Sequence, residues 1–128
     1  MEIGKFVQFE DTGKRIGTYA ISISRAFGFG FLSAFYRKNN ISTYKYVVLF
    51  FNKDEMAIGF AFTNDGETKG RFTITHSLSK TSAGVTAMTF FNRIGIDKLS
   101  IEKYAKQYKV YESVHQQFGK IYYIKLNE

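Results

Sequence analysis

The chain of 128 residues contains no cysteine, no proline and no tryptophan. Without cysteine it forms neither disulfides nor thiolate metal sites, which favours an intracellular protein. Without proline it has no proline-rich linker, and its strands can run uninterrupted. No apolar stretch approaches the roughly 20 residues of a membrane span, and the opening segment MEIGKFVQFED lacks the apolar region of a signal peptide. We therefore expect a cytoplasmic protein that does not associate with membranes.

Basic residues outnumber acidic ones, with 18 Lys and Arg against 11 Asp and Glu, and the net charge is +7. The excess of basic residues is three in residues 1–64 and four in residues 65–128, so no basic tail carries it. Positive charge spread through structured segments suits a polyanionic partner, of which nucleic acid is the commonest. The alternative is that the charge serves only solubility.

Alternation of apolar and polar residues with a period of two dominates the chain and predicts strands. In RFTITHSLSK (71–80) the alternation turns Phe72, Ile74, His76 and Leu78 inward and gives a polar outer row that begins at Arg71. YKYVVLFF is apolar on both faces, which suggests a buried central strand. The other predicted strands are TYAISISR (18–25), MAIGFAFT (56–63), GVTAMT (84–89), and YKVYESV (108–114) with KIYYIKL (120–126) as a final hairpin.

Three short segments predict helices. SAFYRKNN begins with Ser33 as N-cap and ends at Asn39 or Asn40 in a left-handed conformation. TFFNRIG has a similar pattern, with Gly95 at its end. SIEKYAKQY begins at Ser100 and has apolar residues at the helical spacing i, i+3, i+4 and i+7.

The order of predicted elements, two strands, a helix and two strands, occurs twice. FYRKNNI (35–41) aligns with FFNRIGI (90–96), and a strand that begins Tyr-Lys follows each helix or its extension. We therefore expect one α+β domain over residues 1–128, with a mostly antiparallel sheet and short helices. Its first ββαββ repeat spans about 18–63 and its second about 71–126, related by a pseudo-two-fold axis around one core.

The stretch RAFGFGFL (25–32) has two interpretations. Its GFGFL part resembles the aromatic strand motif of RNA-recognition-motif domains, whose rings stack on bases. That motif lies on the third strand of a βαββαβ domain, whereas the residues before Arg25 contain no helical pattern. We therefore favour a core strand, in which Phe27, Phe29 and Phe31 share one face and are buried. Gly28 and Gly30 then leave a flat face that permits the close approach of a helix or of another backbone, and we expect such small faces to seat the helices. Gly59 has the same role in the strand 56–63.

The final hairpin is the better candidate for a binding face. Lys109 and Tyr111 share one face of their strand, and Tyr123 and Lys125 share one face of the next. If the register brings these faces together, tyrosines that stack on bases lie beside lysines that neutralise phosphates. The alternative is that both tyrosines are core residues. The full set of candidate nucleic-acid-binding residues is Arg25, Lys45, Arg71, Lys80, Lys109, Tyr111, Tyr123 and Lys125.

Catalytic patterns are weak in this chain. His76 and His115 are its only histidines, and no Asp or Glu spacing forms a metal site with them. His76 lies on an apolar face, as a hydrogen-bonded core histidine does. The sequence SLSK (77–80) matches the Ser-x-x-Lys nucleophile pattern but ends a strand instead of opening a helix. We expect no enzyme, no cofactor and no metal.

Two family resemblances concern the order of elements. The four strands and helix predicted over residues 44–96 resemble the ββββα unit of the Whirly family and the related transcriptional positive cofactors. This implies binding of single-stranded DNA on sheet surfaces by dimers or tetramers. A strand, a short helix, Gly-Ile and a hairpin resemble AbrB-type swapped-hairpin regulators, which implies binding of duplex DNA.

The sequence thus predicts a non-enzymatic nucleic-acid-binding protein with single-stranded DNA as its first ligand, while duplex DNA and RNA stay open. The large apolar faces of strands 44–51 and 56–62 predict a homodimer or larger assembly. The alternative is a protein–protein interaction or assembly module, such as an inhibitor or an oligomer subunit, in which the aromatic residues form the interface.

Overall fold

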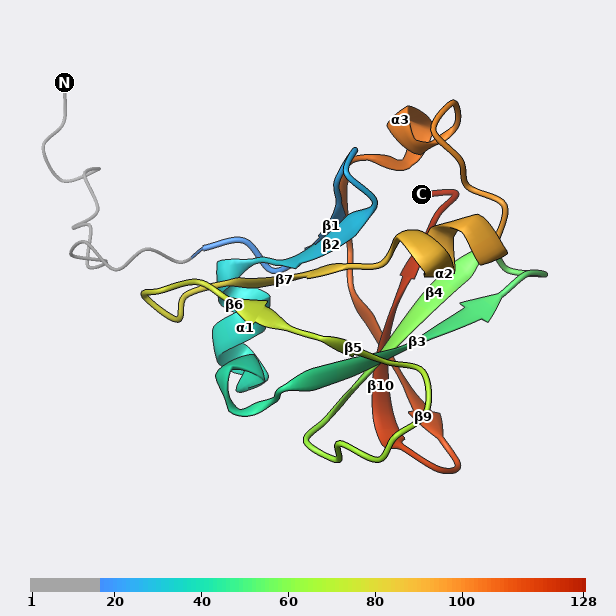
Figure 1. Cartoon of the computed structure of the whole chain (residues 1–128). Coiled ribbons are helices and arrows are strands. Elements are labelled where there is room, and N and C mark those ends of the chain that lie inside the picture. The colour runs from blue at the N-terminus through green and yellow to red at the C-terminus, as the bar shows by residue number, and fades with distance from the viewer. Residues whose placement is uncertain (1–16) are drawn as a thin grey trace, which may run out of the picture.

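A computed structural model describes residues 17–128, which form two five-stranded antiparallel sheets with three short α-helices (Figure 1). This is the α+β class that the sequence predicts. The first 16 residues of the predicted domain, including the segment MEIGKFVQFED, lie outside the described residues. None of the helices in residues 17–128 is both long enough and apolar enough to span a membrane.

The first sheet has the strand order β6-β7-β2-β1-β8, and the second has the order β5-β3-β4-β10-β9. The strands of the first sheet are β6 (Thr75–His76), β7 (Ala83–Thr86), β2 (Gly28–Phe31), β1 (Ile21–Ile23) and β8 (Gln107–Tyr108). Those of the second are β5 (Arg71–Thr73), β3 (Tyr46–Asn52), β4 (Ala57–Thr63), β10 (Gly119–Lys125) and β9 (Tyr111–His115). The helices are α1 (Ser33–Lys38), α2 (Met88–Arg93) and α3 (Ile101–Tyr104), with a 3₁₀ turn η2 (Ile41–Thr43) after α1.

The core lies where phenylalanines of β2 meet the second sheet. Phe29 and Phe31 are 3% and 0% exposed, and their ring centroids lie 4.9 and 5.8 Å from that of Phe60 in β4, edge to face. Phe91 of α2 stacks on Phe29 at 4.9 Å. Such pairs add about 0.5–1.5 kcal/mol to the free energy gained by burying their area. The prediction of a core strand is confirmed for Phe29 and Phe31. It is wrong for Phe27, which lies before β2 with a left-handed backbone, φ 60°, and is only partly buried.

The glycines of β2 face neighbouring strands of their own sheet, not a helix. A Cβ atom on Gly28 would lie 2.9 Å from the backbone oxygen of Val85 in β7. A Cβ atom on Gly30 would lie 2.5 Å from the hydroxyl of Ser22 in β1. Their small size therefore allows close approach within the first sheet.

The segment predicted as one strand over 71–80 passes from one sheet to the other. Its first part, β5, pairs with β3, and after Ile74 its second part, β6, pairs with β7. The chain then turns, with the amide of Ser77 bonded to the carbonyl of Ser82 at 3.0 Å. Leu78 therefore lies fully exposed in the turn, and its predicted inward orientation is wrong.

His76 joins three parts of the core. The carbonyl of Tyr44 can only accept, so the Nε2–H of His76 donates to it at 2.8 Å, and the hydroxyl of Tyr36 donates to Nδ1 at 2.8 Å. Both ring nitrogens are therefore satisfied, as in a structural histidine. The interpretation of His76 as a hydrogen-bonded histidine is confirmed, but its ring is half-buried and is not part of the fully buried core.

Two of the three predicted helices form close to their predicted positions, and each is followed by a left-handed residue, Asn40 with φ 53° and Gly95 with φ 87°. The predicted N-cap is wrong, because Ser33 is the first helical residue and Leu32 precedes it without a side-chain cap. The third helix is shorter than predicted, because it ends at Tyr104. The residues that should have continued it form β8, in which Tyr108 pairs with Ile21. Pairing with a distant strand thus overrides the local helical pattern.

Candidate nucleic-acid interface

One continuous row of residues crosses four strands on the outer face of the second sheet, the face opposite the core. Phe50 of β3 pairs with Gly59 of β4, Gly59 pairs with Tyr123 of β10, and Tyr123 pairs with Tyr111 of β9. Since directly paired residues in antiparallel strands point to the same face, all four belong to this surface. We call it the aromatic row.

The two tyrosines of the row and two lysines form a compact patch. The rings of Tyr111 and Tyr123 stack with centroids 5.3 Å apart and planes 23° from parallel. The ammonium groups of Lys125 and Lys109 lie 4.4 and 5.2 Å from the centroid of Tyr111, within the range of cation–π attraction. Neither tyrosine is fully buried. The register that the sequence prediction required is therefore present, and the alternative of two core tyrosines is not.

An acidic side chain already occupies part of this patch. The hydroxyl of Tyr111 donates to both carboxylate oxygens of Glu128, at 2.6 and 2.8 Å, and the ammonium of Lys125 lies 3.9 Å from one of them. The hydrogen bond to Glu128, followed by burial, raises the pKa of the Tyr111 hydroxyl. The patch thus holds an anionic group beside its lysines and a tyrosine hydroxyl.

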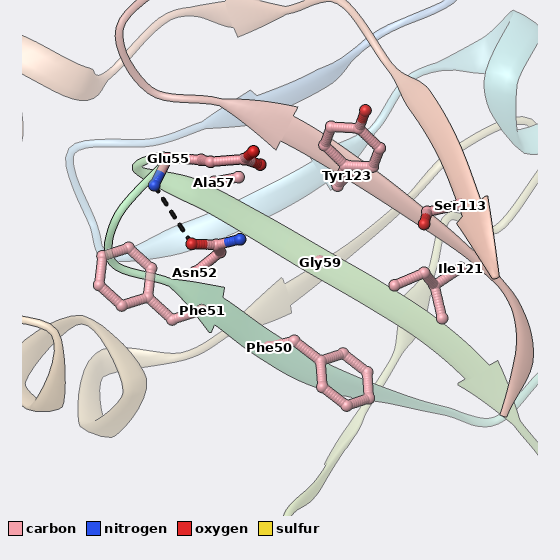
Figure 2. A pocket seen from close by; sticks show the side chains of 9 residues that line it. All are labelled: Phe50, Phe51, Asn52, Glu55, Ala57, Gly59, Ser113, Ile121 and Tyr123. Carbon is pink, nitrogen blue, oxygen red and sulfur yellow. Dashed lines mark hydrogen bonds between the residues drawn. The ribbon is translucent and has the colours of Figure 1, made fainter. Parts of the chain in front are cut away.

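Beside the patch, the aromatic row is hollowed. A cavity of about 240 Å³ lies over Gly59, with Phe50 on one side and Tyr123 and Ile121 on the other (Figure 2). A Cβ atom on Gly59 would come within 3.3 Å of the Cβ of Phe50 and 3.7 Å of Ile121. The absent side chain at Gly59 therefore keeps the floor of the cavity open. The small face of β4 is flanked by side chains of its neighbouring strands and does not seat a helix.

Phe50 is held by the turn of the final hairpin. Its ring centroid lies 4.9 Å from that of His115 and 5.6 Å from that of Phe118. The Nδ1 of His115 accepts the backbone N–H of Gln117 at 3.1 Å, which orients the imidazole. Sequence reasoning missed Phe50 as a surface residue because the strand around it is apolar on both faces. It therefore also missed His115 and Phe118, which pack against Phe50. The turn at residues 53–56 sets Phe50 opposite Gly59, and this local signal could have predicted that pair. It could not have predicted the hollow, which also needs the pairing of β4 with β10.

Arg71, Lys45, Lys80 and Arg25 do not join the patch. Arg71 lies at the opposite edge of the outer face, where its guanidinium sits 5.2 Å from the ring centroid of Tyr46. Lys45 and Lys80 line a separate hollow of about 400 Å³ beside η2. Arg25 lies in the turn between β1 and β2. Of the predicted site residues, Lys109, Tyr111, Tyr123 and Lys125 thus form one cluster. Lys45 and Lys80 form a separate pair, and Arg25 and Arg71 stand alone.

In residues 17–128, no group of three or more His, Cys, Asp or Glu side chains is arranged to hold a metal ion. Comparisons of the chain with protein-family models, with curated proteins and with solved structures give no match. The function is therefore inferred from the arrangement of the chain's own side chains.

Proposed function

We propose that the outer face of the second sheet binds single-stranded nucleic acid, with single-stranded DNA as the preferred ligand, and that the protein is not an enzyme. The observation that carries the proposal is the aromatic row with Lys109 and Lys125 at its end. Aromatic rings on a sheet bind successive bases by stacking, and neighbouring cations neutralise the phosphates. The net charge of +7 adds a general attraction for a polyanion.

Lysine and tyrosine variants separate the two kinds of contact. Lys109→Ala and Lys125→Ala should weaken binding for all oligonucleotide sequences and reduce the salt slope by about one unit each. Tyr111→Ala and Tyr123→Ala should cost about 1–3 kcal/mol per stacked base and leave the salt slope nearly unchanged. Lys98→Ala, in the turn before α3, removes the same charge away from the patch and serves as the control.

The measurement is a fluorescence-anisotropy titration of the parent and variants with single-stranded DNA, duplex DNA and RNA at several salt concentrations. The proposal predicts tightest binding to the DNA single strand and a loss in the four patch variants only. If Lys98→Ala weakens binding as much as Lys125→Ala, the site is misplaced. If the parent binds none of the three ligands at low salt, the function is wrong.

We also propose that the chain is an internally duplicated ββαββ unit. Two features of its topology support this: β2 lies beside β7 and each leads into a helix, and β4 lies beside β10. We further propose a Whirly-like mode of binding in preference to the AbrB-type mode, since the proposed contact is a sheet surface. Superposition of residues 18–63 on 71–126 in an experimental structure tests the duplication. Matching strands and helices would support it.

A homodimer or larger assembly is the remaining proposal on partners. β9 is an edge strand, and its Val114 is 83% exposed. Edge strands offer unpaired backbone groups for pairing with a second copy. Sedimentation at micromolar concentration should therefore find a species larger than the 14.7 kDa chain. If only the monomer sediments and no nucleic acid binds, a module that interacts with another protein becomes the better description.

A further inference from the structure

We propose that the cavity over Gly59 is a subsite for one unstacked base, and that its polar end selects guanine. The inference rests on the proposed function, because the base arrives as part of a single strand bound along the aromatic row. It adds a specific contact to a surface that otherwise binds without regard to sequence.

The walls of the cavity are fixed before any ligand enters. Phe50 on one side is supported by His115 and Phe118, and Tyr123 on the other is supported by its stack with Tyr111. Gly59 leaves the floor between them free of side-chain atoms. A flat aromatic ligand can therefore enter between the two sides without moving either ring, which lowers the entropic cost of binding.

The polar end of the cavity belongs to the turn between β3 and β4. The backbone N–H of Glu55 donates to the Oδ1 of Asn52 at 3.2 Å, which fixes the orientation of the amide. Figure 2 shows the amide nitrogen of Asn52 on the side of Gly59 and the carboxylate of Glu55 reaching along the groove beside Ala57. Among the described residues, the carboxylate of Glu55 has no hydrogen bond or ion pair. This end therefore offers an amide donor and an unused carboxylate acceptor.

The pairing edge of guanine matches these groups best. It presents two adjacent donors, N1–H and the N2 amino group, which a carboxylate accepts together, and a carbonyl acceptor, O6, that an amide N–H can reach. Adenine and cytosine present one amino group each to the carboxylate. Thymine presents a single N–H between two carbonyl oxygens, which the carboxylate repels. The order of preference is therefore guanine first and thymine last.

The test uses thymidine oligomers of one length in which the central base is dG, dA, dC or dT. We expect the parent protein to bind the dG oligomer about tenfold more tightly than the all-dT oligomer, as a two-bond base contact does. Glu55→Gln should abolish the preference while binding to the all-dT oligomer persists. Asp54→Asn, in the same turn but outside the cavity lining, makes the same change of charge and should retain the preference.

A second variant acts on the floor of the cavity. Gly59→Ala places a methyl group 3.3 Å from the Cβ of Phe50 and should reduce the guanine preference, with folding checked by circular dichroism. Equal binding of all four oligomers by the parent overturns the subsite and leaves the proposed function standing. A preference that survives in Glu55→Gln, or that is lost equally in Asp54→Asn, also overturns it. If no oligomer binds, both proposals fail.

Discussion

Substituting alanine for the two glycines of β2 should have unequal effects on stability. A Cβ atom at Gly28 would lie 2.9 Å from the backbone oxygen of Val85, and a backbone oxygen moves only if β7 moves. Val85 is 4% exposed and packs in the core, so a shift of β7 disturbs its packing. We expect Gly28→Ala to lower the free energy of unfolding by about 1–3 kcal/mol, the usual cost of overpacking.

The matched variant Gly30→Ala meets a side chain that can rotate. The Cβ atom would lie 2.5 Å from the hydroxyl oxygen of Ser22, which a change of χ1 moves away. Alanine also reduces the entropy of the unfolded chain, which stabilises by about 0.4–1 kcal/mol. Gly30→Ala should therefore stay within about 1 kcal/mol of the parent.

Urea unfolding followed by circular dichroism measures both variants, and equal m-values ensure that the midpoints compare stability alone. The reasoning fails if Gly30→Ala is destabilised as much as Gly28→Ala. It also fails if Gly28→Ala unfolds at the parent's urea concentration, because the contact with Val85 would then cost nothing.

Two further predictions concern charge and pH. Glu128→Gln removes the carboxylate that competes with phosphate for Lys125 and Tyr111. It should therefore tighten single-strand binding by about two- to fivefold in the anisotropy assay. Unchanged affinity would place the phosphates elsewhere. Burial, with a smaller contribution from Tyr104, raises the pKa of Tyr108 from 10.0 to about 12. The folded state therefore favours the neutral phenol. The stability that Tyr108 contributes is fully present below pH 10 and is lost as the pH rises toward 12. Urea midpoints measured across this range should fall more steeply in the parent than in Tyr108→Phe, and parallel curves would contradict the assignment.

The sequence predicts the positions of the strands and helices better than it predicts which strands pair with one another. Period-two alternation identifies the strand segments because each strand has one face in the core, as Phe29 and Phe31 show. The crossing between sheets at Ile74 and the short third helix depend on pairing with residues far away in the chain. No local pattern contains that information. This is also why the predicted inward orientation of Leu78 is wrong.

The candidate site likewise has a part that the sequence predicts and a part that it does not. The pairing of Tyr111 with Tyr123 lies within one hairpin, so the register could be anticipated from the two strands alone. The hollow over Gly59 also needs the pairing of β4 with β10, which joins Gly59 to Tyr123 across more than half of the described chain. Phe50 and Glu55 therefore emerge as neighbours of the patch only in the folded structure.

The central claim is that the outer face of the second sheet contacts single-stranded nucleic acid, and an NMR titration tests it most directly. Amide chemical shifts of the labelled protein are followed while a thymidine oligomer is added at low salt. The account predicts the largest changes in β3, β4, β10 and β9, centred on the aromatic row. Changes confined to the first sheet, or no changes at saturating oligomer, would contradict it.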